Sequence, residues 1–196
     1  MAEILLLNGP NLGQLGTRRP EMYGTTTLAE IERDVRKTVA ESGHTVRCLQ
    51  DESEAALVRA VHAAADCVGA IVNPGALMIA GWSLRDALES FPGPWMEVHL
   101  SNVFAREPFR HNSVISPLAS GVLCGLGAYG YQLAALGLVH RLAQDAARSA
   151  GPAGSGPGAA VGAPGPGAAV GAPGPVHDHG LGTGSGAGRA PGPGAT

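Results

Sequence analysis

Tyr23 follows two arginines in the segment NGPNLGQLGTRRPEMYG, residues 8–24. A phenol has a pKa of about 10 and is a poor base at neutral pH. A guanidinium held against the phenol oxygen favours the phenolate, so Arg18 or Arg19 could turn this tyrosine into a general base. The spacing alone favours a simpler interpretation, a loop tyrosine beside two solvated arginines.

A second group that could transfer protons is His99, in the segment EVHLSN, residues 97–102. Histidine is the side chain best suited to proton transfer near neutral pH. Ser101 and Asn102 follow it, and exposed backbone N–H groups just past a strand can hold a carboxylate. Taken alone, His99 fits a structural histidine as well as a catalytic one.

A pair of arginines follows in AREPFRHNS, residues 105–113, where Arg106 and Arg110 are four residues apart. Such a pair usually lies on a solvated face. Near the end of a strand it can also hold an anion or hydroxyl groups.

The elements that must position these residues alternate between strand-like and helix-like patterns. The predicted strands are residues 3–8, 44–50, 67–73, 94–100 and 113–117, and the predicted helices are 27–42, 53–66, 82–91 and 127–148. Thr27 and Glu30 form a capping-box pattern at the start of the first helix. The alternation predicts a flavodoxin-like α/β fold, a five-stranded parallel doubly wound sheet with helices on both faces. Ligands then bind beyond the carboxyl ends of the strands.

The segment 8–24 is about seventeen residues long, whereas strand-to-helix connections usually have 2–6 residues. This length predicts a functional lid. Its glycines do not follow the G-x-G-x-x-G pattern and no G-K-[ST] follows, so a phosphate-binding loop is not supported.

Composition excludes several classes of function. The net charge of −3 argues against nucleic acid as a partner, and the apolar run EILLL is too short for a signal or membrane segment. Cys48, Cys67 and Cys124 are odd in number and widely spaced, which favours reduced thiols in a cytoplasmic protein over disulfides or a metal site. No metal or cofactor is expected.

The chain divides into a predicted catalytic domain, residues 1–150, and a Gly/Pro/Ala-rich tail, residues 151–196, in which PGAAVGAPG occurs twice in tandem. The tail has too few large apolar residues to offset its ordering entropy, so we expect it to be disordered. His177 and His179 could bind a metal weakly, but without a third ligand group nearby we favour no site.

Several motifs in the same order resemble the type II 3-dehydroquinate dehydratases: NGPNLGQLGTR, NPGA with LRDAL, EVHLSNV and AREPFRHNS. The resemblance covers about residues 3–145. It implies the trans-elimination of water from 3-dehydroquinate through an enolate, giving 3-dehydroshikimate in the shikimate pathway of aromatic amino acid biosynthesis. It also implies a flavodoxin-like subunit in a homododecamer, a tetramer of trimers, with no metal or cofactor.

The resemblance also implies four catalytic residues. Tyr23 matches the tyrosinate that removes a proton from the ring carbon next to the ketone, and Arg18 matches the lid arginine that favours this tyrosinate. Asn11 matches the asparagine that positions a water against the developing enolate oxygen. His99 matches the general acid that protonates the departing C1 hydroxyl.

Five further residues match the family's substrate-binding positions. Leu100 and Ser101 match the pair that holds the substrate carboxylate through backbone amides and the serine hydroxyl. Asn73 matches the residue that orients the substrate and the catalytic histidine, and Arg110 matches the one that holds ring hydroxyls. Asp86 matches an aspartate that reaches the substrate from a neighbouring subunit.

One loop departs from the family. Where the family usually has threonine, histidine and threonine, this chain has Met78, Ile79 and Ala80. An isoleucine cannot donate a hydrogen bond to a ring hydroxyl, and Asp86 loses the histidine that it would contact. Asp86 could instead form a capping box with Ser83 at the start of the helix 82–91.

A second departure is Arg19, where the family usually has glutamate. The residues matched to proton transfer are retained, whereas the substrate-holding side is altered. Three hypotheses follow: an ordinary dehydratase with a variant loop, a paralogue that dehydrates a related ring, or an inactive flavodoxin-like assembly module. Joint retention of six matched residues argues against the inactive module: Asn11, Arg18, Tyr23, Asn73, His99 and Arg110.

Overall fold

The computed structural model describes residues 1–150 of the 196-residue chain. The predicted tail, residues 151–196, and the His177–His179 segment lie outside the described residues. No helix within residues 1–150 combines the length and the apolar character needed to cross a membrane.

The five strands form one parallel sheet in the order β2-β1-β3-β4-β5. They are β1 (Ala2–Asn8), β2 (His44–Gln50), β3 (Gly69–Asn73), β4 (Trp95–His99) and β5 (Gly121–Cys124). This strand order is that of the flavodoxin-like folds, and the predicted fold class is confirmed.

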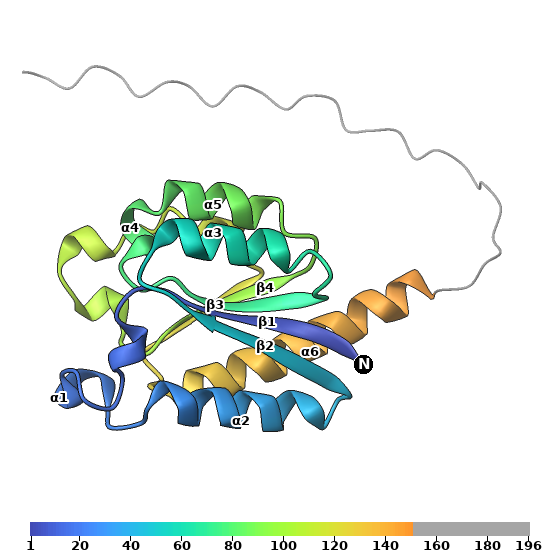
Figure 1. The fold of residues 1–196 in the computed structure, drawn as a ribbon, viewed down its shortest axis with the longest axis horizontal. Coiled ribbons are helices and arrows are strands. Elements are labelled where there is room, and N and C mark those ends of the chain that lie inside the picture. The colour runs from blue at the N-terminus through green and yellow to red at the C-terminus, as the bar shows by residue number, and fades with distance from the viewer. Residues whose placement is uncertain (151–196) are drawn as a thin grey trace, which may run out of the picture. The chain divides into compact units, whose positions relative to one another are not determined.

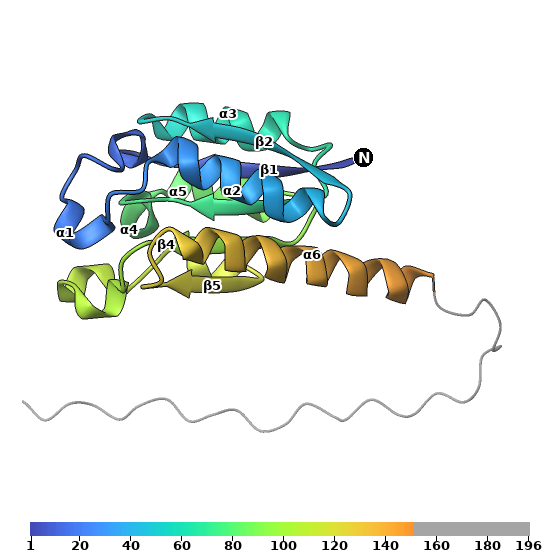
Figure 2. The same ribbon diagram turned by 90° about the horizontal axis from the view of Figure 1, so that it is seen from below.

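Helices cover both faces of the sheet (Figure 1). The helices are α1 (Pro20–Tyr23), α2 (Leu28–Ala40), α3 (Glu54–Ala63), α4 (Leu77–Ala80), α5 (Trp82–Glu89) and α6 (Tyr129–Ser149). Residues 1–150 also contain four 3₁₀ turns: η1 (Leu12–Gln14), η2 (Val103–Ala105), η3 (Pro108–Arg110) and η4 (Ser116–Leu118). α3 and α5 pack on one face, and α2 and α6 lie together on the other, as Figure 2 shows from below.

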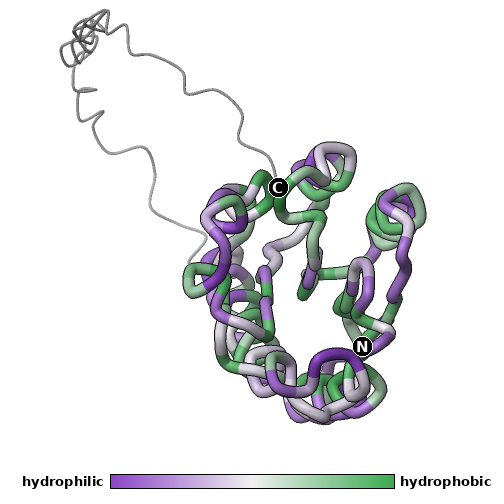
Figure 3. The backbone as a smooth tube through the Cα atoms, turned by 90° about the vertical axis from the view of Figure 1, so that its left-hand side faces the viewer, coloured by the Kyte–Doolittle hydropathy of each residue, from purple (hydrophilic) through white to green (hydrophobic). Residues whose placement is uncertain are grey.

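The core has one hydrophobic cluster on each face because successive strand residues point to opposite sides. Ile4 and Leu6 of β1 pack with α2 and α6, whereas Leu5 and Leu7 pack with α3 and α5. Along the tube of Figure 3 hydrophobic and hydrophilic segments alternate in the helices, as expected for elements with one buried face. β1 is buried on both faces, so the position at which the predicted lid, residues 8–24, begins is fixed by the core.

The predicted capping box of α2 is confirmed. The Thr27 hydroxyl accepts the Glu30 N–H at 3.3 Å, and the Glu30 carboxylate accepts the Thr27 N–H at 2.8 Å. These hydrogen bonds, chiefly that from the Thr27 backbone, lower the pKa of Glu30.

The predicted fifth strand, residues 113–117, is wrong: the strand is β5, Gly121–Cys124, which pairs with β4. The Ser113 hydroxyl accepts the N–H groups of Ile115 and Ser116, at 3.1 and 3.0 Å, and closes a turn that continues into η4. Ile115 in this segment is apolar and fully buried, which explains why the sequence of residues 113–117 resembled that of a strand. β5 is a short, half-buried edge strand, GVLC, with glycines at residues 121 and 125.

Candidate active site

A cavity of about 160 Å³ lies at the carboxyl ends of β1, β3 and β4, where the predicted fold places ligands. The lid and the yellow-green turns around residue 105 lie at this end of the sheet in Figure 1. The cavity brings together all predicted site residues except Asp86, namely Asn11, Arg18, Tyr23, Asn73, His99, Leu100, Ser101 and Arg110.

The lid approaches β3 closely through Gly9. Its N–H donates to the Asn73 carbonyl at 2.8 Å, and a Cβ at this position would lie 2.6 Å from the Pro74 carbonyl oxygen. Only glycine allows such a backbone approach. The first and third strand loops are therefore held side by side at the cavity.

The loop after β2 holds the next part of the lid. Asn11 adopts a left-handed conformation, with φ 67°, and donates its N–H to the Glu52 carboxylate at 2.7 Å. Gln50 Nε2 donates to the same carboxylate at 2.9 Å and to the Gly9 carbonyl at 3.3 Å. These contacts fix the backbone from which the Asn11 side chain reaches the cavity.

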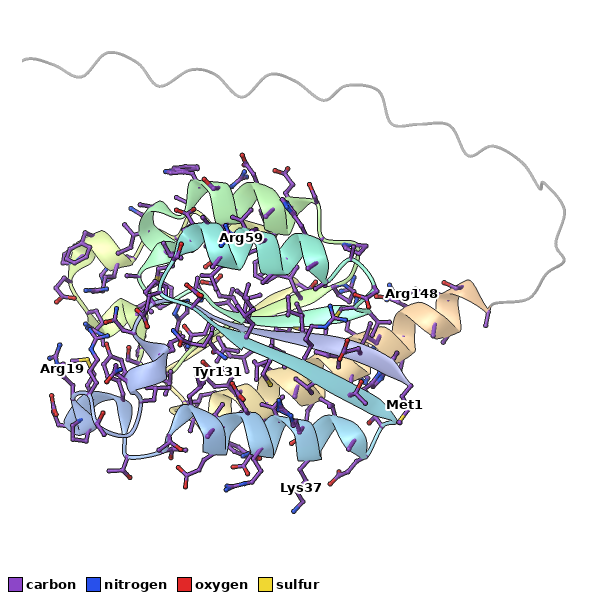
Figure 4. The ribbon with its side chains drawn as sticks, viewed as in Figure 1. Met1, Arg19, Lys37, Arg59, Tyr131 and Arg148 are labelled. Atoms are coloured by element: carbon purple, nitrogen blue, oxygen red, sulfur yellow. The ribbon has the colours of Figure 1, made fainter. Side chains whose placement is uncertain are left out.

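Arg19 also has a positive φ, 45°, at the start of α1. This region is costly for a long side chain and marks a local constraint in the lid. The Arg19 side chain is half exposed and pairs with Glu21 at 3.4 Å, and Figure 4 shows it at the outer end of the lid. Arg19 lines the rim of the cavity and makes no hydrogen bond to Tyr23 within residues 1–150.

The cation nearest the Tyr23 hydroxyl is Arg106 rather than Arg18. Arg106 Nη1 lies 3.5 Å from Tyr23 Oη and 3.3 Å from Ser101 Oγ, whereas the Arg18 guanidinium carbon lies 6.0 Å from the centre of the tyrosine ring. The hydrogen bond to Tyr23 raises the pKa of Arg106. The sequence singled out Arg106 through its spacing from Arg110, but it gave no sign that this arginine turns towards the lid.

Arg110 also lines the cavity, and its Nε donates to the Glu107 carboxylate at 2.8 Å. The same carboxylate lies 3.5 Å from Arg106 Nε. Glu107 therefore holds both arginines of the pair, which leaves Arg110 Nη groups for hydroxyls of a ligand.

His99 is oriented by a carboxylate. Its Nε2 lies 2.6 Å from Glu97 Oε1, and both side chains are buried. The two residues are two apart on β4, so they project from the same face of the sheet. A buried carboxylate is costly without a partner, and Glu97 Oε2 has none within residues 1–150. The pairing leaves His99 Nδ1 to exchange a proton. Sequence reasoning missed Glu97, although a carboxylate in an apolar strand was a usable signal.

Asn73 is buried at the end of β3, and both ends of its side-chain amide are engaged. Its Oδ1 accepts the Gly75 N–H at 3.1 Å, and its Nδ2 donates to the Tyr131 hydroxyl at 2.8 Å. Tyr131 lies on α6 and was also missed from the sequence.

Asp86 lies on α5, outside the cavity, with 79% of its side chain exposed. The predicted capping box of Ser83 with Asp86 is wrong, because α5 begins at Trp82 and has Gly81 as its N-cap. The Leu84 N–H donates to the Glu54 carboxylate of α3 at 3.0 Å. A residue from another helix thus takes the place of the local cap.

The divergent loop forms α4, and Met78 rather than Ile79 lines the cavity. Met78 is 4% exposed, Ile79 is half buried, and Ala80 is exposed. Met78, His99 and Val103 also line a second cavity of about 530 Å³. The apolar Met78 thioether therefore lines both of the cavities that His99 lines.

Residues 1–150 contain no group of three or more His, Cys, Asp or Glu side chains placed to hold a metal ion. The three cysteines form no disulfide. Burial raises the pKa of the Cys48 thiol to about 12.

Comparisons with known proteins agree with this arrangement. The family model "Dehydroquinase class II" matches residues 2–139. A 3-dehydroquinate dehydratase of Xanthomonas euvesicatoria is 48% identical over 148 residues, which are 74% of this chain and 100% of the relative. One from Ectopseudomonas mendocina is 50% identical over 138 residues, 68% of this chain and 92% of the relative.

A solved structure gives the same result. The type II dehydroquinase from Propionibacterium acnes superposes with a TM-score of 0.68 at 41% identity, over 71% of this chain and 97% of that one. With the family model covering most of the chain and the relatives nearly half identical, this chain belongs to the class II dehydroquinase family of hydro-lyases.

Proposed function

We propose that this protein removes water from 3-dehydroquinate by trans-elimination, giving 3-dehydroshikimate. The observation that carries the proposal is one cavity lined by two separate proton-transfer groups, Tyr23 on the lid and His99 on β4. The relatives bear the name of this activity. The reaction belongs to the synthesis of aromatic amino acids, and the free cysteines are in keeping with a cytoplasmic site.

In the first step the Tyr23 phenolate removes a proton from the ring carbon next to the ketone, and an enolate forms. The Arg106 guanidinium lies 3.5 Å from the phenol oxygen, and Arg18 adds a second positive charge near the ring. Since Arg106 also contacts Ser101, it links the base to the residue that binds the substrate carboxylate.

The enolate is stabilised by groups whose positions are fixed before substrate arrives. Asn11, held through its backbone by Glu52, positions a water against the enolate oxygen. The backbone amides of Leu100 and Ser101 hold the carboxylate, and Arg110 holds ring hydroxyls. Such preorganised dipoles commonly supply the largest share of catalysis.

In the second step His99 gives a proton to the C1 hydroxyl, which leaves as water while the enolate collapses to the conjugated ketone. Glu97 holds the imidazole by its Nε2 and favours delivery of the proton from Nδ1. The proton gained by Tyr23 and the proton lost by His99 balance over the cycle, so the elimination needs no oxidant or reductant.

The active form that we propose is a homo-oligomer, a dodecamer built as a tetramer of trimers. Asp86 lies outside its own cavity, as expected for a residue that serves a neighbouring subunit. The large apolar side chains Trp82, Phe104 and Phe109 are exposed on the single subunit. Light scattering on the purified protein measures this assembly directly.

A second candidate is a paralogous activity on a related ring that lacks a hydroxyl or bears a bulkier, less polar group. The observation in its favour is Met78, whose apolar side chain occupies the cavity wall beside His99. A ring hydroxyl facing this thioether would lose its hydration without gaining a partner.

The deciding experiment mixes the purified protein with 3-dehydroquinate and follows the absorbance of the conjugated product. We expect turnover in the wild type that disappears in Tyr23→Phe. Binding without turnover would favour the paralogous substrate, and neither binding nor turnover would favour an inactive assembly module.

A further inference from the structure

A chain of buried hydrogen bonds connects the cavity to the C-terminal helix. Asn73 Nδ2 donates to Tyr131 Oη at 2.8 Å, and Tyr131 Oη donates to Asn8 Oδ1 at 2.8 Å. The three side chains are almost fully buried, and they join the ends of β1 and β3 to the start of α6. Figure 4 shows Tyr131 between the sheet and the helices of the α2–α6 face.

These hydrogen bonds run in a single direction, from Asn73 through Tyr131 to Asn8. A hydroxyl can accept one hydrogen bond while it donates another, and Tyr131 does both. Burial raises the pKa of Tyr131 well above its ordinary value, so its hydroxyl keeps its proton. Tyr131 therefore remains a donor to Asn8 and an acceptor from Asn73 at neutral pH.

This direction fixes the amide of Asn73. Its Oδ1 accepts from the Gly75 N–H, and its Nδ2 gives one hydrogen to Tyr131. A rotated amide would place two donors against each other at Gly75 and would lose that hydrogen bond. The second hydrogen of Nδ2 makes no hydrogen bond within residues 1–150, and Asn73 is one of the residues that line the cavity.

We propose that Tyr131 is a positioning residue for the dehydration: it holds the Asn73 amide in the one orientation that presents an N–H to the bound ring. The inference rests on the proposed function and adds to it a residue that does not touch the substrate. Asn8 in turn fixes the direction of the Tyr131 hydroxyl. Its own Nδ2 has no hydrogen-bond partner within residues 1–150, so its packing alone does not account for an asparagine here.

The test is Tyr131→Phe, with Tyr129→Phe as its matched control. Both residues lie in the first turn of α6, but Tyr129 is 57% exposed and makes no side-chain hydrogen bond within residues 1–150. We expect Tyr131→Phe to lower kcat/KM for 3-dehydroquinate roughly three- to tenfold, because it removes one neutral hydrogen bond that orients the Asn73 amide. Tyr129→Phe should leave kcat/KM unchanged.

A double-mutant cycle separates positioning from a purely structural role. In an Asn73→Ala background, Tyr131→Phe should change kcat/KM less than twofold, because the amide that it orients is gone. A purely structural tyrosine would lower the melting temperature in both backgrounds and change kcat/KM by the same factor in each. The shape of the pH profile should be the same with and without the hydroxyl.

If Tyr131→Phe does not fold, Asn8→Ala serves instead, because it removes a side chain with a buried Nδ2 that makes no hydrogen bond within residues 1–150. We expect a two- to fivefold loss of kcat/KM that vanishes in the Asn73→Ala background. An active wild type with fully active Tyr131→Phe, or fully active Asn8→Ala, overturns the positioning role and leaves the function intact. A wild type inactive on 3-dehydroquinate overturns both.

Discussion

The two proposed proton-transfer groups of the cavity, His99 and Tyr23, are held in different ways. His99 stands on a central strand, is buried, and contacts Glu97 at 2.6 Å. Tyr23 ends a one-turn helix in the lid, and its nearest cation, Arg106, lies 3.5 Å away. The sheet therefore fixes the proposed acid before substrate binds, whereas the proposed base depends on the lid. Substrate closing the lid would shorten the Tyr23–Arg106 contact, as catalytic hydrogen bonds often tighten on binding.

The largest effect should come from Tyr23→Phe. Removing the hydroxyl deletes proton abstraction and little packing, so kcat should fall by roughly 10²–10⁴-fold while the assembly persists. Steady-state kinetics and light scattering measure both. Retention of more than about a tenth of wild-type kcat would show that Tyr23 is not the base.

On the acid side, Glu97→Gln keeps the shape of the residue but removes the charge that holds His99. Loss of a charged hydrogen bond should lower kcat roughly 10–100-fold, with a smaller change in KM. Unchanged kcat would mean that packing alone orients His99. His99→Ala, the companion variant, should suppress dehydration at least as strongly.

On the base side, Arg106→Met should lower kcat/KM roughly three- to twentyfold, because a long, partly buried hydrogen bond contributes less than a short buried one. Arg19→Met is its control, since Arg19 lines the same cavity but makes no hydrogen bond to Tyr23 within residues 1–150. A larger loss of activity in Arg106→Met than in Glu97→Gln would contradict this comparison. It would show that Tyr23 on the lid is held more firmly than His99 on the sheet.

The divergent loop adds a smaller effect on binding. Met78→Thr with Ile79→His should lower KM for 3-dehydroquinate roughly two- to twelvefold, as for one neutral hydrogen bond gained. Since Met78 is the residue in the wall, Met78→Thr alone should give part of this change. A KM that stays the same or rises would show that α4 repacks instead, and it would support a less polar substrate.

Deletion of residues 151–196 should have the smallest effect. The segment is too poor in large apolar side chains to supply a core, and the Xanthomonas relative is matched over its whole length by 74% of this chain. We expect unchanged melting temperature, oligomer size and kcat. Precipitation or a smaller oligomer would reveal a structural role for the tail.

The sequence by itself determined the parallel sheet, the capping box at Thr27 and the three loops that meet at the cavity. These features follow from local patterns: apolar runs of strand length, a cap three residues from its partner, and motifs that end at strand termini. Because the carboxyl ends of parallel strands share one edge, local patterns sufficed to bring Tyr23, Asn73 and His99 to one site.

Only the tertiary structure decided which side chains hold these residues. Arg106 reaches Tyr23 across 83 positions, Tyr131 reaches Asn73 across 58, and Glu54 replaces the local cap that Ser83 and Asp86 seemed to form. No period or spacing encodes such contacts, because they depend on how separate elements pack. For the same reason the sequence placed the fifth strand at buried Ile115, where a turn forms, and missed the half-buried edge at residues 121–124.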